Sequence, residues 1–160
     1  MPADNTPLSP LERAKRIAAE YLKRPHSEKE VRDRLRAKGV APEDIETVCA
    51  LCVDYGFIND AEYAGMIVRH YAGRGYGPGR IRTEFIRRGI PRELWDDALA
   101  EFPQNDDIID RLLAARLRGK EPCDRKELEK AGNALFRKGY TWDEIRAALS
   151  RYQQDLDYTE

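Results

Sequence analysis

A basic residue followed by glycine recurs every fifty residues along this chain, at Lys38-Gly39, Arg88-Gly89 and Lys138-Gly139. Apolar residues keep a constant spacing around each glycine. They are Val31, Ile81 and Ala131; Leu35, Phe85 and Leu135; and Ile45, Trp95 and Ile145. The register extends upstream to Ala14, Ala64 and Ala114, and to Ile17, Ile67 and Leu117. A gap-free match of buried-type positions is typical of tandem structural repeats. We therefore predict three repeats, at residues 8–57, 58–103 and 104–155.

Helix-start signals divide each repeat into three helices. A capping residue stands three positions before an acidic one at Ser9, Ser27, Asn59, Asp124 and Thr141, which is a helix N-terminal pattern. Proline, which suits the first turn of a helix, marks three further starts at Pro42, Pro78 and Pro91. We expect the first helix to reach about Lys23, the sixth to end at Pro103 and the seventh to cover 106–119.

No stretch alternates apolar and polar residues as a half-buried strand would. The predicted fold is therefore all-α, with three tandem three-helix repeats forming an elongated, curved array. A charged fraction of 36% and a hydrophobic fraction of 41% suit such a protein with small cores. Arrays of this kind usually act by presenting a long surface, so binding is the expected mode of action.

The fifth predicted helix, at 78–88, is the most basic. Pro78 suits its first turn and Gly89 its left-handed C-terminal position. We expect Ile81, Phe85 and Ile86 to form one inward apolar stripe. The opposite face is expected to carry the charged side chains, which are Arg80, Arg82, Arg87 and Arg88 with Glu84 as the one acid.

Charge is segregated along the chain although the net charge is only −1. Residues 69–92 contain seven arginines and one acid, whereas residues 93–110 contain seven acids and no lysine or arginine. Solvated helix faces are one interpretation of such runs. A surface that recognises charged partners is the other.

The candidates for chemistry are few. Cys49 and Cys52 form a C-x-x-C, but they lie on an apolar helix face, and Cys123, His26 and His70 are too distant in sequence to complete a zinc site. No serine or cysteine adjoins a histidine in a catalytic motif. We therefore predict no metal, no cofactor and no enzymatic activity.

The glycine-rich stretch Gly75-Tyr-Gly-Pro-Gly79 lacks the Lys-Ser/Thr ending of a phosphate loop, so a helix–helix turn is the better interpretation. Tyr71 and Tyr76 alternate with arginines nearby. That composition is common at protein interfaces and at sites for single-stranded nucleic acid. Packing of Tyr71 in the core and of Tyr76 in the turn remains the alternative.

The cellular setting follows from composition. The chain has no apolar run long enough for a membrane span and no signal-peptide pattern at its start. Three cysteines, an odd number, argue against a secreted disulfide framework. We expect a cytoplasmic monomer.

Three motifs resemble the RecX regulatory proteins. They are Ser27-Glu-x-Glu-Val-x-x-x-Leu35 with Lys38-Gly39; Asn59-Asp60-x-x-Tyr63-Ala64 leading to Arg69; and Gly77-x-x-Arg80-Ile81-x-x-Glu84-Phe85-x-x-Arg88-Gly89-Ile90. The resemblance covers about residues 11–101. The third repeat keeps mainly Leu135, Lys138-Gly139 and Ile145, and its turn Lys120-Glu-Pro-Cys-Asp124 departs from the pattern.

The resemblance implies tandem three-helix repeats and a bacterial modulator of the RecA recombinase. Such a protein binds RecA and its nucleoprotein filament in the helical groove and lowers ATPase, strand-exchange and coprotease activity, with roles in DNA recombination, DNA repair and the SOS response. The residues expected to meet RecA or DNA are Arg69, Arg74, Tyr76, Arg80, Arg82, Arg87 and Arg88, with Arg24 and Arg32 from the first repeat. The alternative is a helical protein that binds DNA directly, and weak DNA contact is also open to a RecA regulator.

Overall fold

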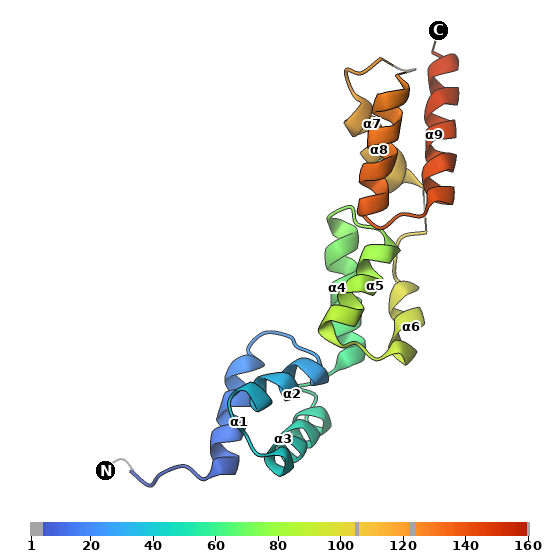
Figure 1. Ribbon diagram of the computed structural model, residues 1–160. Helices are drawn as coiled ribbons and strands as arrows, with labels where there is room; N and C mark the ends of the chain where they lie inside the picture. Colours follow the sequence, from blue (N-terminus) through green and yellow to red (C-terminus); the bar gives the residue numbers. More distant parts are fainter. Residues whose placement is uncertain (1–4, 105, 122–123, 160) are drawn as a thin grey trace. The chain divides into compact units, whose positions relative to one another are not determined.

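The computed structural model describes residues 5–104, 106–121 and 124–159. Within these ranges the chain forms nine α-helices, one 3₁₀ turn and no strand (Figure 1). The helices are α1 Pro10–Tyr21, α2 Glu28–Ala37, α3 Pro42–Asp54, α4 Asp60–Gly73, α5 Pro78–Arg88, α6 Trp95–Leu99, α7 Asp107–Leu117, α8 Arg125–Arg137 and α9 Trp142–Asp157, with the 3₁₀ turn η1 at Arg92–Leu94. The all-α prediction is confirmed. Cys123 lies outside the described residues.

The predicted starts follow their local chemistry. Ser9, Ser27 and Thr141 each form a complete capping box with the glutamate three positions later. The predicted sixth helix differs, because Pro91 is followed by the 3₁₀ turn η1 before the short helix α6. Gly39, Gly89 and Gly139 adopt the left-handed backbone expected after a helix, with φ of 77°, 72° and 101°.

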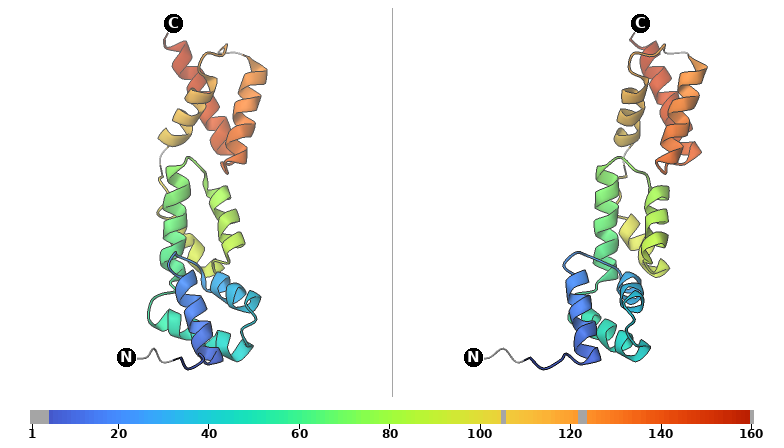
Figure 2. Two further views of the ribbon diagram at one scale, coloured as in Figure 1. Left: turned by 90° about the vertical axis from the view of Figure 1, so that its left-hand side faces the viewer. Right: turned by 60° about the vertical axis from the view of Figure 1, so that its left-hand side comes forward.

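Contacts divide the chain into two compact units. The first unit combines Met1–Ala64 with Phe85–Trp95, and the second combines Gly65–Glu84 with Asp96–Glu160. Helices α1–α3 pack together in the first unit, and α7–α9 pack together in the second (Figure 2). The repeat boundaries expected from the sequence stay a prediction.

Each unit has a core that follows the fifty-residue register. The first core contains Ala14, Ala18, Val31, Leu35, Ile45, Val48, Cys49 and Ile58. The second contains Ile109, Leu113, Leu117, Ala131, Leu135, Tyr140, Ile145 and Ala148. Ala114 was expected to match Ala14 but is exposed. Helix α7 instead buries residues at a spacing of four, and an alanine is small enough to be placed in water at little cost.

Two expectations for α5 are wrong. Ile86 is 68% exposed and does not belong to the inward stripe, whereas Glu84 is 3% exposed. The helical period explains both, because position 84 is three residues after Ile81 and shares its face, while position 86 is turned away. Ile81 and Phe85 are fully buried, as expected.

In the first unit, the start of α2 contacts the end of α5. The buried hydroxyl of Ser27 donates a hydrogen bond to the carbonyl oxygen of Arg88. The next backbone N–H, that of Glu28, donates to Asp60 Oδ1 at 2.9 Å. A Cβ atom at Gly89 would lie 2.6 Å from Cβ of Lys29, so this contact requires glycine for space as well as for its positive φ.

In the second unit, the start of α5 contacts the turn after α8 in the same way. The N–H of Gly77 donates to the carbonyl oxygen of Lys138 at 2.7 Å, and that of Gly79 donates to Gly139 at 2.9 Å. The hydroxyl of Tyr140 donates to the carbonyl oxygen of Gly75 at 3.0 Å. Residues 77 and 138 each stand fifty positions after Ser27 and Arg88. The fifty-residue register therefore governs tertiary hydrogen bonds as well as buried positions.

We predict that Phe85→Ala lowers the free energy of unfolding by about 3–5 kcal/mol, because a fully buried aromatic ring is lost and leaves a cavity. Urea unfolding followed by circular dichroism measures this change. Ile86→Ala, one position along the same helix, is the control and should change stability by less than about 0.5 kcal/mol. Similar losses for the two variants would contradict the assigned inward face.

We further predict that Gly77→Ala destabilises the protein by about 1–3 kcal/mol, as overpacking does. Its Cβ atom would lie 2.7 Å from the carbonyl group of Gly139, and backbone cannot move aside cheaply. Gly73→Ala is the matched control, since a Cβ atom there meets nothing within 4 Å. The control should melt at the parent's temperature or slightly above it, and an equal loss in both variants would speak against the close approach.

Candidate functional site

The basic side chains of α5 divide between packing and exposure. Arg80 Nη2 lies 3.5 Å from Oε1 of the buried Glu84. The Cζ atom of Arg80 lies 5.5 Å from the ring centroid of Tyr76, and Lys138 Nζ lies 4.7 Å from the same centroid. Two cations thus contact one aromatic ring beside the docked turn of the second unit. Arg80 and Tyr76, both expected to meet a partner, are held by neighbours within the fold.

Arg88 is also held by the fold. Its guanidinium donates a hydrogen bond of 2.7 Å to the hydroxyl of Tyr63, and its carbonyl group accepts from Ser27. Burial raises the pKa of Tyr63, so this hydroxyl stays protonated at neutral pH. Arg87, one position before, is exposed at the last turn of α5.

Three predicted binding residues point to solvent in the second unit. Arg74 follows the end of α4, and Arg82 lies on α5; both are exposed and make no ion pair with another described residue. Arg69 is exposed but pairs with Glu101, with 2.7 Å between Nη1 and Oε2. Among the predicted binding residues of this unit, Arg74 and Arg82 are therefore the most open to an outside anion.

Arg32 ties α2 to α3 in the first unit. Its guanidinium donates to both carboxylate oxygens of Glu46, and Nη2 also lies 3.0 Å from Glu28 Oε1. The hydrogen bond to Glu46 raises the pKa of Arg32, and the same bond lowers the pKa of Glu46. Two carboxylates already satisfy this arginine, so a partner would have to displace them.

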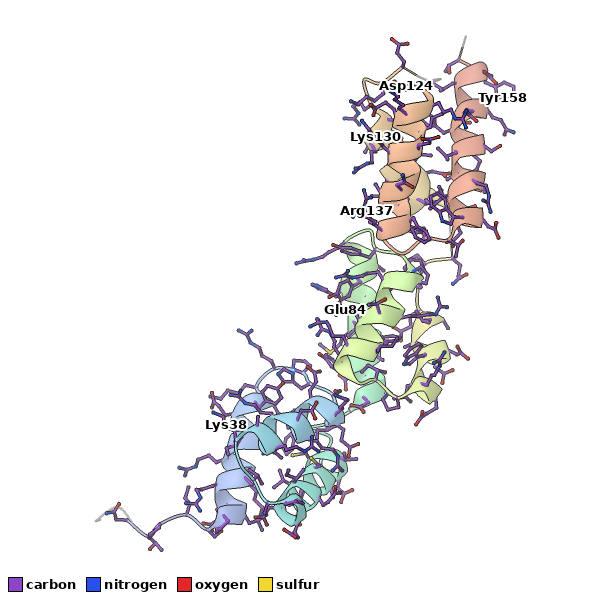
Figure 3. All side chains as sticks on the ribbon, in the orientation of Figure 1. Lys38, Glu84, Asp124, Lys130, Arg137 and Tyr158 are labelled. Atoms are coloured by element: carbon purple, nitrogen blue, oxygen red, sulfur yellow. The ribbon has the colours of Figure 1, made fainter. Side chains whose placement is uncertain are left out.

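Arg24, by contrast, belongs to a larger basic surface that the sequence did not reveal. An open hollow of about 910 Å³ on the first unit, here called the basic hollow, gathers cations from α1, α2 and the turns after them. They are Arg13, Arg16, Lys23, Arg24, Arg34 and Lys38, the last labelled in Figure 3. Of these six cations, Lys23 alone forms an ion pair with another described residue, since its Nζ lies 2.6 Å from Glu20 Oε2. Five exposed cations are left for an outside anion.

An aromatic pair forms part of the basic hollow. The rings of Tyr21 and His26 stack with centroids 3.7 Å apart and planes within 7°. Arg34 Cζ lies 5.4 Å from the centroid of Tyr21. Burial is the main cause that raises the pKa of Tyr21, with Glu30 adding to it. The spacing of Arg13 with Arg16, and of Arg34 with Lys38, is the helical period that could have predicted a shared face.

The other chemical candidates can be placed briefly. Cys49 is buried and Cys52 half-buried, and burial raises the pKa of both thiols. Across the described ranges, no three His, Cys, Asp or Glu side chains lie together as metal ligands would. In the same part of the chain, no helix combines the length and the apolar character that a membrane crossing needs.

Comparison with known proteins gives a consistent result. A sequence model described as the first three-helix domain of RecX matches residues 14–50, and one described as the second three-helix domain matches residues 59–99. The regulatory protein RecX of Vibrio vulnificus is 31% identical over 143 residues, which are 88% of this chain and 94% of that protein. The same protein of Pseudomonas fluorescens is 34% identical over 154 residues, or 92% and 97% of the two chains.

A solved structure supports the fold. The crystal structure of RecX from Lactobacillus salivarius superposes with a TM-score of 0.76 and covers 91% of this chain and 97% of its own. Its sequence is 24% identical, so this likeness concerns the fold alone.

We predict that Arg80→Ala lowers the free energy of unfolding by about 1 kcal/mol, because it removes one cation from Tyr76 and one partner from the buried Glu84. Arg82→Ala, two positions along α5, should change it by less than about 0.5 kcal/mol. Urea unfolding of the two variants under one set of conditions makes the comparison. A larger loss for Arg82→Ala would overturn this division between packed and exposed arginines.

Proposed function

Because this chain belongs to the RecX family of regulatory proteins, we propose that it binds the RecA recombinase and its filament on single-stranded DNA. Binding lowers the ATPase, recombinase and coprotease activities of RecA. The chain acts as a cytoplasmic monomer without a cofactor and without catalysis of its own. Residues 8–57, 58–103 and 104–155 act as its three repeats.

The basic hollow is the observation that carries this proposal furthest. Five of its cations have no ion pair within the described part of the chain, and four of these are arginines. A guanidinium binds a carboxylate through two parallel hydrogen bonds, so clustered arginines favour an acidic protein surface. Carboxylates of the partner would supply the ion pairs that these five cations do not form within the protein.

Arg82 and Arg74 supply the corresponding contacts of the second repeat, where Arg69 and Arg87 are also exposed. Each contact is made to an outside anion and needs no chemistry in this chain. A protein bound in this way changes filament turnover when it binds one state of the filament better than the other.

Direct DNA binding is the second candidate, and the Tyr21–His26 stack beside unpaired arginines favours it. Aromatic faces next to cations suit unstacked bases and phosphates. Affinity for DNA alone should then fall linearly with the logarithm of salt concentration, with a slope of roughly −0.7 per phosphate contacted on a single strand. A RecA regulator of the proposed kind binds filaments more tightly than it binds the same DNA without RecA.

The test is RecA ATPase on single-stranded DNA with and without this protein. We predict that Arg16→Glu with Arg24→Glu raises the concentration needed for half-maximal inhibition by about tenfold or more, since two attractive charges become repulsive. Both side chains are exposed, so helicity by circular dichroism should equal that of the parent.

Lys130→Glu with Arg137→Glu on α8 (Figure 3) is the control, with an equal change of net charge at exposed positions. It should inhibit within about twofold of the parent. Equal losses in both double variants would remove the basic hollow from the binding surface. A parent protein without effect on RecA would refute the proposed function itself.

A further inference from the structure

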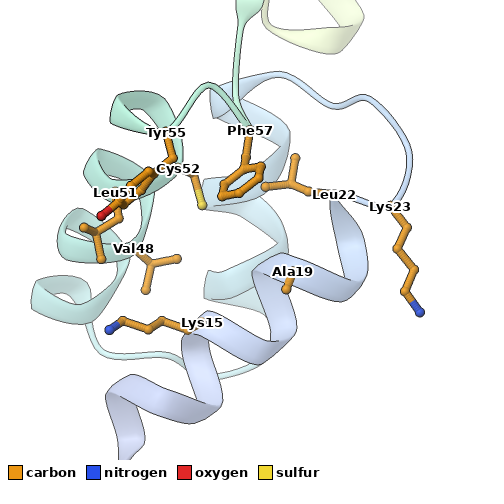
Figure 4. Close-up of a pocket in the computed structure, with 9 residues that line it drawn as sticks. All are labelled: Lys15, Ala19, Leu22, Lys23, Val48, Leu51, Cys52, Tyr55 and Phe57. Atoms are coloured by element: carbon orange, nitrogen blue, oxygen red, sulfur yellow. The ribbon is translucent and has the colours of Figure 1, made fainter.

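The first unit has a second concave surface, and its lining is mainly apolar. An open pocket of about 530 Å³, here called the apolar socket, lies between α1, α3 and the turn after α3 (Figure 4). Its apolar lining includes Leu22, Val48, Leu51, Cys52, Tyr55 and Phe57. None of the predicted binding residues belongs to it.

The socket exposes an unusual amount of aromatic surface. Tyr55 is 74% exposed and Phe57 is 67% exposed, with their ring centroids 6.3 Å apart. Val53, two positions before Tyr55, is 44% exposed as well. Large apolar side chains that gather on a surface around a concavity mark an interaction site more often than scattered ones do.

The fifty-residue register separates this socket from the scaffold. The positions fifty residues after Leu51 and Phe57 hold Glu101, in the second predicted repeat, and Asp107, at the start of the third. The position of Lys15 holds Gly65. Positions needed for packing keep their apolar character through the repeats, whereas these change to polar residues or lose the side chain. These three lining positions of the socket are therefore not reproduced fifty residues further along the chain.

The charged residues that line the socket indicate the charge of its occupant. Lys15 and Lys23 belong to the lining, and no acidic side chain does. Lys15 makes no ion pair with any other described residue. Lys23 also lines the basic hollow, so the cations of that surface continue to the edge of the socket.

We propose that the apolar socket receives a bulky apolar side chain carried by an acidic segment of the RecA partner. The inference rests on the proposed function and names the contact that gives it specificity. The apolar side chain would cover Tyr55 and Phe57, and flanking carboxylates would meet Lys15 and displace Glu20 from Lys23.

Cys52 provides a direct readout, because its half-buried thiol lines the socket, while Cys49 is fully buried. In a Cys123→Ser background, the rate of alkylation by iodoacetamide reports access to the socket. RecA filaments on single-stranded DNA should slow the reaction at Cys52 by about tenfold or more. A partner side chain in the socket would exclude solvent, and the reagent with it, from the thiol. Single-stranded DNA without RecA should leave the rate unchanged.

Tyr55→Ser with Phe57→Ser removes the aromatic surface at two exposed positions and should weaken filament binding by about tenfold. Phe136→Ser is the control, an aromatic residue that is 49% exposed on α8. It should bind filaments within about twofold of the parent. Circular dichroism of each variant shows that helicity is retained.

The outcomes are distinct. If the parent fails to bind RecA filaments, the proposed function is wrong and this inference ends with it. If the parent binds while Cys52 reacts equally fast in the complex, and the double variant binds as tightly, the socket is not a contact and only the inference is overturned. If Cys52 becomes protected with rising concentration of this protein alone, and sedimentation shows self-association, a second copy occupies the socket and the inference is likewise overturned.

Discussion

One hydrogen-bonded contact recurs in this protein, once between the start of α2 and the end of α5 and once between the start of α5 and the turn after α8. The residue that begins a middle helix donates to the carbonyl group just before a left-handed glycine, from Ser27 to Arg88 and from Gly77 to Lys138. The donor is a buried hydroxyl in one unit and a backbone N–H in the other, yet the register is the same. Because unpaired polar groups are costly when buried, each contact fixes where its two segments meet. The glycines at 77, 79, 89 and 139 follow from the closeness of that approach.

These contacts also decide which cations are available to a partner. Arg80 and Lys138 flank Tyr76 beside one docked turn, and Arg88 provides the carbonyl group of the other. The side chains of these three basic residues are therefore largely engaged in contacts within the protein. Five cations that form no ion pair with another described residue lie elsewhere, in the basic hollow. A count of arginines along the chain would rank these surfaces in the opposite order.

The sequence predicted the helices, the caps and most of the core, because capping and apolar spacing act within a few residues of each other. It failed where burial depends on a neighbour. Glu84 was placed in water because it is charged, although its spacing from Ile81 and Phe85 puts it on the inward face, beside Arg80. The basic hollow was missed because its members come from separate segments that only tertiary packing brings together. The apolar socket was missed for the same reason, since Leu22 and Phe57 are far apart in the chain.

The two concave surfaces of the first unit have complementary physical roles. Exposed cations attract an acidic partner over roughly the Debye length of about 8–10 Å, and salt weakens that attraction. They speed association with acidic proteins and disfavour partners of like charge. An apolar socket adds little at a distance, but it stabilises only a partner whose side chain fits it, and salt affects that term weakly. Lys23 lines both surfaces, so a single acidic segment could meet the charge of one and the apolar lining of the other. Selectivity for one partner would then depend on the part of the first repeat that its copies do not reproduce.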